Sequence, residues 1–255
     1  MTEPDHERRF GGLRRLLGQQ AAQKVFDGHV VVVGIGGVGS WAAEALARSG
    51  MGRLTLVDMD HVAESNVNRQ IHALDGTLGM AKVLAMRDRI QQINPGCQVH
   101  VVDDFVTDEN WPAVLEGVPA PQAVVDACDQ VRAKVAMAHW AVSHRVPFVS
   151  VGAAGGKRVP HRVELGDLAE VTHDPLLAQL RYRLRKHHGA ARQGRMGVSC
   201  VFSKEAVRPA DASCSTETSD HSLNCHGYGS SVAVTATFGM CAAAWVMNAL
   251  ADAKK

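Results

Sequence analysis

The sequence predicts an α/β fold: a mostly parallel, Rossmann-like sheet with helices on both faces, and an appended C-terminal half that extends the sheet. Short apolar runs alternate with helical patterns between residues 29 and 151, as parallel strands and their crossover helices do. The first run opens into a glycine-rich turn, Gly34-x-Gly36-x-x-Gly39. The second run ends at the acidic residue Asp58. Together these observations predict a nucleotide-binding sheet.

The elements follow in chain order. Short valine-rich runs predict buried strands, and segments with helical periodicity predict the helices between them. The predicted strands cover 29–33, 53–57, 99–102, 123–127 and 147–151, and the predicted helices cover 13–26, 41–49, 79–93 and 132–144. After residue 152 we expect a strand over 158–165, a basic helix over 175–188, a strand over 197–202, an irregular stretch over 203–229 and a small-residue helix over 229–250. We expect one domain over 1–255, with halves 9–152 and 153–255.

Composition limits the classes of function. The formal net charge is +1, so attraction to nucleic acid needs a local basic patch. The six cysteines form no C-x-x-C pair, which argues against a zinc ribbon. The N-terminus has no secretory signature, so we expect a cytoplasmic protein. Segment 229–250 has the length of a membrane span, but its small and polar residues favour a buried helix or a dimer interface.

The glycine turn predicts a phosphate site at a helix N-terminus, with Asp58 bonding ribose hydroxyls. This interpretation includes Gly37, which lies inside the turn. A dinucleotide needs no further cations, whereas the β- and γ-phosphates of ATP do. Arg69, Lys82 and Asp129 supply two cations and a carboxylate suited to Mg²⁺, the groups that nucleotidyl transfer uses. Each alone is commonly a surface charge or a helix cap; their combination in this order favours ATP over a nicotinamide cofactor.

Three stretches carry a resemblance to a known family: "GIGGVGSWAAEALARSGMGRLTLVDMDHVAESNVNRQ", "GMAKV" and "VVDACD". They resemble the ubiquitin-activating-enzyme superfamily, including the bacterial enzymes of molybdopterin and thiamine synthesis, over residues 9–152. The resemblance implies ATP-dependent adenylation of a carboxylate. It implies that Arg69, Lys82 and Asp129 are catalytic, with Asp129 as the Mg²⁺ ligand. The implied ATP-binding set is Gly34, Gly36, Gly37, Gly39, Asp58, Asp60, Asn66, Arg69, Gln70, Lys82 and Asp129.

The second half narrows the resemblance. "RFGGLRRLLG", "DPLLAQLRYRLRKHHG", "GVSCVFSKEAVRP" and "LNCHGYGSS" are similar to the bacterial tRNA threonylcarbamoyladenosine dehydratases. This implies that the carboxylate of the threonylcarbamoyl group, beside the tRNA anticodon, is adenylated and then closed into a ring, with release of AMP and pyrophosphate. It also implies a homodimer, with 153–255 as the tRNA and dimerisation half, and leaves a monovalent cation open.

An alternative within the superfamily is an adenylyltransferase that activates the C-terminal glycine of a ubiquitin-like sulfur carrier. The absent C-x-x-C pairs argue against it. The N-terminal run Arg9-Phe10-Gly11-Gly12 lacks the second arginine that reaches a partner subunit's site in such enzymes, and whether Arg14 or Arg15 replaces it stays open. A nicotinamide oxidoreductase and a scaffold without catalysis both leave the phosphate-handling residues without a role.

Two further features remain. Segment 181–195 contains no acid, and we expect it to bind tRNA phosphates through Arg181, Arg183, Arg185, Lys186, Arg192 and Arg195; the alternative is a solvated helix face. Cys214 and Cys225 lie within the irregular stretch. Because ring closure within one substrate needs no thiolate, a sulfur-relay contact with a cysteine desulfurase and its sulfur acceptor is left open beside a structural role.

Overall fold

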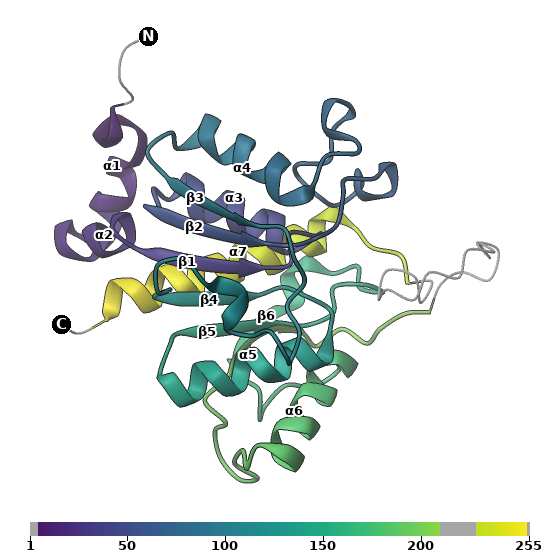
Figure 1. Cartoon of the computed structure of the whole chain (residues 1–255). Coiled ribbons are helices and arrows are strands. Elements are labelled where there is room, and N and C mark those ends of the chain that lie inside the picture. Colours follow the sequence, from purple (N-terminus) through teal and green to yellow (C-terminus); the bar gives the residue numbers. More distant parts are fainter. Residues whose placement is uncertain (1–4, 210–227, 254–255) are drawn as a thin grey trace.

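The computed structural model describes residues 5–209 and 228–253, which form one seven-stranded sheet in the order β3-β2-β1-β4-β5-β7-β6 (Figure 1). Its strands are β1 His29–Val33, β2 Arg53–Val57, β3 Gln98–Val102, β4 Ala123–Asp126, β5 Phe148–Val151, β6 Val163–Asp167 and β7 Ser199–Ser203. Every pairing is parallel except the antiparallel pairing of β6 with β7. The predicted fold class is confirmed, and the five strands of the first half lie within a residue of their predicted bounds.

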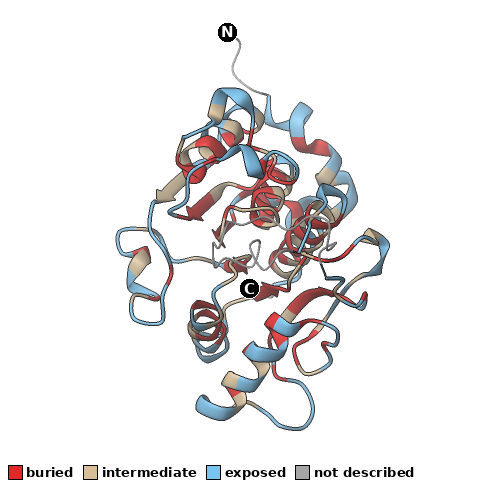
Figure 2. Ribbon diagram, turned by 90° about the vertical axis from the view of Figure 1, so that its right-hand side faces the viewer, coloured by how far each residue is buried: buried red, intermediate tan, exposed pale blue. Residues whose placement is uncertain are grey.

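The described helices are α1 His6–Leu17, α2 Gln19–Phe26, α3 Gly39–Arg48, α4 Lys82–Ile93, α5 Val131–His144, α6 Pro175–His187 and α7 Val232–Asp252. One core joins α2, α3, α4 and α7 to one face of the sheet, and a second joins α5 and α6 to the other. In β1, Val30 and Val32 enter the first core and Val31 and Val33 the second. Burial on both faces explains why this strand is apolar throughout. Figure 2 shows buried residues on the strands and the inward faces of helices.

Several element boundaries differ from the sequence prediction by up to three residues, and two larger differences have clear physical causes. The single helix expected over 13–26 is two helices, because Gly18 has a φ of 85°, a left-handed conformation that interrupts the helix. The strand expected over 158–165 begins only at Val163. Residues Pro160–Arg162 form a 3-10 turn instead, since Pro160 fixes its own backbone angle and cannot donate to a strand ladder.

The C-terminal helix α7 is long and apolar enough to cross a membrane by length and composition. Its small residues instead permit close packing within the fold: a Cβ on Gly239 would lie 2.5 Å from the carbonyl oxygen of Val38, at the start of α3. Phe238, Ala242 and Val246 are fully buried in the core that α7 shares with the first half. The core therefore accounts for the composition of this helix, and the two halves of the chain are parts of one unit.

A buried ion pair connects the second helical layer to the sheet. The Lys134 ammonium on α5 lies 3.0 Å from the Asp126 carboxylate at the end of β4, and both side chains are 0% exposed. Lys134 also donates to the Val151 carbonyl at 2.8 Å, and the Ser150 hydroxyl donates to Asp126 at 2.6 Å. Burial alone would lower the pKa of Lys134, but the Asp126 carboxylate holds it above its ordinary value. The pair therefore ties α5 to both β4 and β5.

We predict that Lys134→Met lowers the free energy of unfolding by about 3–5 kcal/mol, because it leaves the Asp126 carboxylate buried without its cation. Urea denaturation measures this change. Lys204→Met is the matched control, because the Lys204–Glu164 pair is 55% and 43% exposed and such pairs contribute about 1 kcal/mol or less. Adding Asp126→Leu to Lys134→Met should recover much of the loss. Equal effects for the buried and exposed lysines would contradict this account.

Candidate functional site

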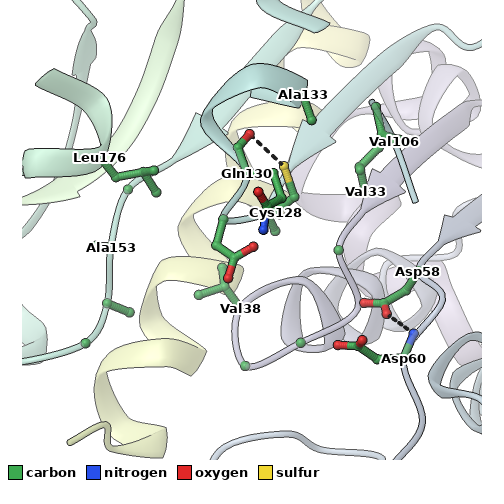
Figure 3. Close-up of a pocket in the computed structure, with 18 of the residues that line it drawn as sticks. Val33, Val38, Asp58, Asp60, Val106, Cys128, Gln130, Ala133, Ala153 and Leu176 are labelled. Carbon is green, nitrogen blue, oxygen red and sulfur yellow. Dashed lines mark hydrogen bonds between the residues drawn. The ribbon is translucent and has the colours of Figure 1, made fainter. Parts of the chain in front are cut away.

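A cavity of about 900 Å³ opens at the carboxyl ends of β1, β2, β4 and β5. The chain order reverses between β1 and β4, the position where open α/β sheets bind ligands. Among the predicted site residues, the cavity is lined by Gly34, Gly36, Gly37, Asp58, Asp60, Arg69, Gln70, Lys82 and Asp129. In Figure 3, Asp58 and Asp60 lie at one side of the cavity, Cys128 and Gln130 near its middle, and Ala153 and Leu176 at the other side.

The glycine turn shapes the floor of the cavity. Gly34 has a φ of 84°, and a Cβ there would lie 2.9 Å from the backbone of Ala127. A Cβ on Gly39 would overlap the carbonyl oxygen of Gly34. Gly36 has open space around it, with the Gln70 amide 4.0 Å from a Cβ position. Helix α3 has no side-chain N-cap, and the Ser40 N–H donates to the Gly36 carbonyl at 3.1 Å. The N–H groups that precede Ser40 are therefore the ones available to an anion such as a phosphate.

Asp58 is held in place by backbone groups on both of its carboxylate oxygens. The Ile35 N–H donates to one oxygen at 2.6 Å, and the Asp60 N–H donates to the other at 2.8 Å. Burial raises the pKa of Asp58, while Lys82 and these two N–H groups oppose the rise. Each oxygen keeps a lone pair for a further donor. The carboxylate is therefore oriented to accept hydrogen bonds from a hydroxyl pair such as that of ribose.

Two cations border the same cavity. The Lys82 ammonium, at the first position of α4, lies 2.6 Å from the Asp60 carboxylate. The Arg69 guanidinium donates to the Ser65 carbonyl at 2.5 Å and to the Asn68 side chain at 3.0 Å. Both cationic side chains are buried, with 6% and 8% of each residue exposed. The buried side-chain oxygen of Gln70 has no hydrogen-bond partner among the described residues, which fits a ligand that donates there.

Asp129 lies in the loop between β4 and α5, half-buried and on the cavity wall. No cluster of three or more potential metal-binding side chains occurs in the described part of the chain. A single carboxylate nevertheless fits Mg²⁺, which is commonly held by one or two carboxylates together with substrate phosphates and water. The same loop places Cys128, Gln130 and, at the start of α5, Arg132 on the cavity. The sequence analysis missed these three, although they flank Asp129.

Two predicted residues do not line the cavity. The Asn66 side-chain oxygen accepts from the Ala63 N–H at 3.1 Å, so it stabilises the Glu64–Asn66 turn that precedes Arg69 and Gln70. Gly39 lies beneath the turn, packed against Gly34. The Asn66 side-chain nitrogen donates to the Ser65 hydroxyl at 3.5 Å, and a role for Asn66 in ATP binding stays a prediction.

The described cysteines lack the character of nucleophiles. Burial raises the pKa of Cys97 to about 12 and also raises the pKa values of Cys128, Cys200 and Cys241. A thiol of raised pKa is a poor nucleophile. Cys214 and Cys225, the two residues considered for sulfur relay, lie outside the described residues.

The basic segment divides into structural and exposed residues. The Arg181 guanidinium donates to the carbonyls of Leu168 and Val171 at 3.1 and 2.7 Å, and Arg185 donates to the Ala191 carbonyl at 3.1 Å. Arg183 lines a second groove between α5 and α6. The exposed members are Lys186, Arg192 and Arg195.

The N-terminal arginines lie away from the cavity of their own chain. Helix α2 ends just before β1 begins, so α1 and α2 lie at the amino ends of the strands (Figure 1). Arg14 is engaged there: its guanidinium donates to Gln19 at 3.1 Å and lies 5.5 Å from the centre of the Phe26 ring. Arg15 is exposed.

The fold and this site define a nucleotide-binding α/β protein with charged groups placed around the phosphates of a bound nucleotide. The model of the ThiF family matches residues 10–255, and the chain belongs to the ThiF family. The tRNA threonylcarbamoyladenosine dehydratase of Escherichia coli is 47% identical over 92% of this chain and 90% of its own length. The dehydratase of Haemophilus influenzae is 37% identical over 98% of this chain and 96% of its own.

A solved structure agrees with these relatives. The E. coli tRNA N6-threonylcarbamoyladenosine dehydratase in complex with ATP matches with a TM-score of 0.86 at 43% identity, and the match covers 98% of this chain and 97% of that one. An AMP complex of the same protein matches with a TM-score of 0.85.

We predict that Gly39→Ala abolishes measurable ATP binding, because its Cβ would overlap the Gly34 carbonyl oxygen and displace the phosphate-binding turn. Isothermal titration with ATP tests this, alongside thermal unfolding. Gly76→Ala is the matched control: a Cβ there meets no atom within 4 Å. Wild-type ATP affinity in Gly39→Ala would show that the turn does not need this close approach.

Proposed function

We propose that this chain catalyses the ATP-dependent dehydration of threonylcarbamoyladenosine beside the tRNA anticodon. The observation that carries the proposal is similarity to dehydratases along almost the whole chain, 92% in one relative and 98% in another. The cavity adds independent support, because its glycine turn, carboxylate and cations suit ATP.

The chemistry proceeds in two balanced steps. An oxygen of the substrate carboxylate attacks the α-phosphorus of ATP, and the bond to the β-phosphate breaks, which releases pyrophosphate. The carbamoyl amide group of the same threonylcarbamoyl chain then attacks the activated carbonyl carbon and loses one proton, while the bond from that carbon to the oxygen of AMP breaks. AMP carries away the oxygen that would otherwise leave as hydroxide, which is a much poorer leaving group. The tRNA has thereby lost one molecule of water.

Within this proposal the residues have separate roles. Asp58 accepts from the ribose hydroxyls, and the turn N–H groups with Arg69 and Lys82 hold the phosphates. The Lys82 ammonium is paired with the Asp60 carboxylate at 2.6 Å. The incoming phosphates therefore either replace that carboxylate or share the ammonium with it. Asp129 would hold Mg²⁺, which when bound neutralises charge on the departing pyrophosphate.

The alternative, activation of a sulfur-carrier protein, is less well supported. The molybdopterin-synthase adenylyltransferase of Salmonella typhimurium is 36% identical but matches only 54% of this chain and 52% of its own length. That match leaves nearly half of this chain unaccounted for.

The direct test is to incubate the protein with ATP, Mg²⁺ and threonylcarbamoylated tRNA, and to analyse the nucleosides by mass spectrometry. We expect the modified nucleoside to lose the mass of one water, with one AMP formed per event. Unchanged nucleoside, together with adenylation of a carrier protein's C-terminal glycine, would favour the alternative.

We predict that Asp129→Ala abolishes AMP formation while ATP binding is partly retained, because loss of a Mg²⁺ ligand weakens charge neutralisation most in the transition state. Titration with ATP and a pyrophosphate-release assay separate the two effects. Asp75→Ala, an exposed carboxylate on the Asp75–Thr77 turn, is the control and should be silent. Wild-type turnover in Asp129→Ala would refute the assignment.

We also propose a homodimer that uses the outward face of α7. That face exposes Ala233, Met240, Ala244 and Asn248, without a charged residue among them. An uncharged stripe of this kind is suited to a second helix. Arg14 and Arg15, which lie away from their own cavity, would then be candidates for a partner's site.

We predict that Ala244→Glu converts the dimer into a monomer at micromolar concentration, because each interface would bury an unpaired carboxylate. Light scattering after gel filtration measures the mass. Ala113→Glu, also on an exposed alanine, is the matched control. A wild-type monomer, or an Ala244→Glu dimer, would contradict this use of α7.

A further inference from the structure

A second groove, of about 550 Å³, runs between α5 and α6. Its lining consists of Asp108, Trp111, Arg132, Val135, Ala136, His139, Trp140, Ser143, His144, Arg183, His187 and His188. Asp108 and Arg132 also line the nucleotide cavity. The two hollows are therefore neighbours that share part of their walls, so a substrate bound in one lies beside the other.

The charge of the groove is one-sided. The guanidinium groups of Arg132 and Arg183 outnumber the single carboxylate of Asp108, and the four imidazoles add positive charge when they are protonated. Neither arginine makes a hydrogen bond or ion pair with another described residue, in contrast to Arg181, which is bound to two carbonyls. The two groove arginines are thus available for an anion from outside the protein.

The histidines form a close group. The rings of His139 on α5 and His188 after α6 have centroids 4.3 Å apart. Burial, and then the neighbouring His139 and His187, lower the pKa of His188 below its ordinary value. An anion in the groove would reverse that effect, since negative charge favours the protonated imidazoles.

Aromatic surface lies on the α5 side of the groove. The Trp140 and His144 rings stack with centroids 5.2 Å apart and an angle of 28°, and Trp111 meets Trp140 edge-on at 5.4 Å. The His144 ring is held by its contact with the Trp140 carbonyl at 2.8 Å. Rigid aromatic groups beside cations are the features that bind single-stranded nucleic acid, through base stacking and phosphate contacts.

We propose that the groove between α5 and α6 binds the RNA strand adjoining the target nucleoside, with Arg183, His139 and His188 on its phosphates and the Trp140–His144 stack against an unpaired base. The proposal rests on the dehydratase function, which requires an anticodon loop to place one nucleoside in the cavity while the rest of the strand leaves it. The groove adjoins the cavity at Asp108 and Arg132, and its two arginines complement the charge of a phosphate backbone. It assigns RNA binding to α5, beyond the basic segment 181–195.

The test measures binding of an unmodified anticodon stem–loop RNA by fluorescence anisotropy. The groove variant combines His139→Gln, Arg183→Gln and His188→Gln, none of which lines the nucleotide cavity. It should bind the RNA about tenfold more weakly or worse, because charged contacts to phosphate are lost. Its affinity for ATP should stay at the wild-type value, and thermal unfolding checks that it is folded.

Two comparison variants separate position from overall charge. Arg8→Gln with Arg87→Gln lowers the net charge on α1 and α4 and should leave RNA affinity nearly unchanged. Lys186→Gln with Arg192→Gln and Arg195→Gln removes the exposed basic residues beside the groove. If that flanking variant loses affinity while the groove variant does not, the strand follows the exposed segment and the proposal is wrong.

The pH dependence provides a readout that a purely structural role would not change. Wild-type affinity for RNA should fall between about pH 6 and about pH 8, as bound imidazolium groups lose their protons, and the groove variant should fall less. Equal pH profiles would overturn the role of the histidines. If the wild-type protein dehydrates the modified tRNA and the groove variant has the same KM for that tRNA, the groove proposal is wrong. If the wild-type protein does not dehydrate the modified tRNA, the proposed function is wrong instead. A wild-type protein that binds no RNA refutes the groove as well.

Discussion

The buried pair of Lys134 and Asp126 is the interaction on which the site depends. Its ammonium joins α5 to the ends of β4 and β5, with 0% exposure for both side chains. Asp126 also accepts from the backbone N–H of Cys128 at 3.3 Å and from its thiol at 3.1 Å. The carboxylate thus holds the first residues of the loop that carries Asp129. A charge pair in so apolar a setting costs desolvation energy, and that cost is offset only when every partner is in place.

The site also depends on the close approach of two backbone segments, the turn after β1 and the loop after β4. Gly34 packs against Ala127, so the turn after β1 and the loop after β4 meet across the sheet without side chains between them. Asp58 then binds the turn from the β2 side through the Ile35 N–H at 2.6 Å. The ends of three strands therefore meet at one side of the cavity. Because these contacts are made by backbone, a ligand in the cavity meets groups that are already oriented and need little reorganisation.

The second half of the chain completes the first. Helix α7 returns to pack on α3 through Gly239 and shares its core, while β7 and β6 widen the sheet beyond β5. The widening gives α6 a surface beside α5, and the groove between these helices shares Asp108 and Arg132 with the nucleotide cavity. Arginines therefore gather beside the nucleotide site, although the chain has a net charge of only +1.

Much of this protein could be predicted from local pattern. Alternating apolar runs determined the strands of the first half, and the glycine turn with Asp58, Arg69, Lys82 and Asp129 indicated the cavity lining, because strand ends and turn residues act over short stretches of chain. Other features depended on tertiary structure. Arg181 has the right chemistry to bind a phosphate, yet its guanidinium donates to the carbonyls of Leu168 and Val171. In the groove, the rings of His139 and His188, which are far apart in sequence, have centroids 4.3 Å apart. The sequence alone determined which groups can bind phosphate. The packing of α5 and α6 on the sheet decided which of these groups face a common space, because the distances between helices and strands are not recorded in any local sequence pattern.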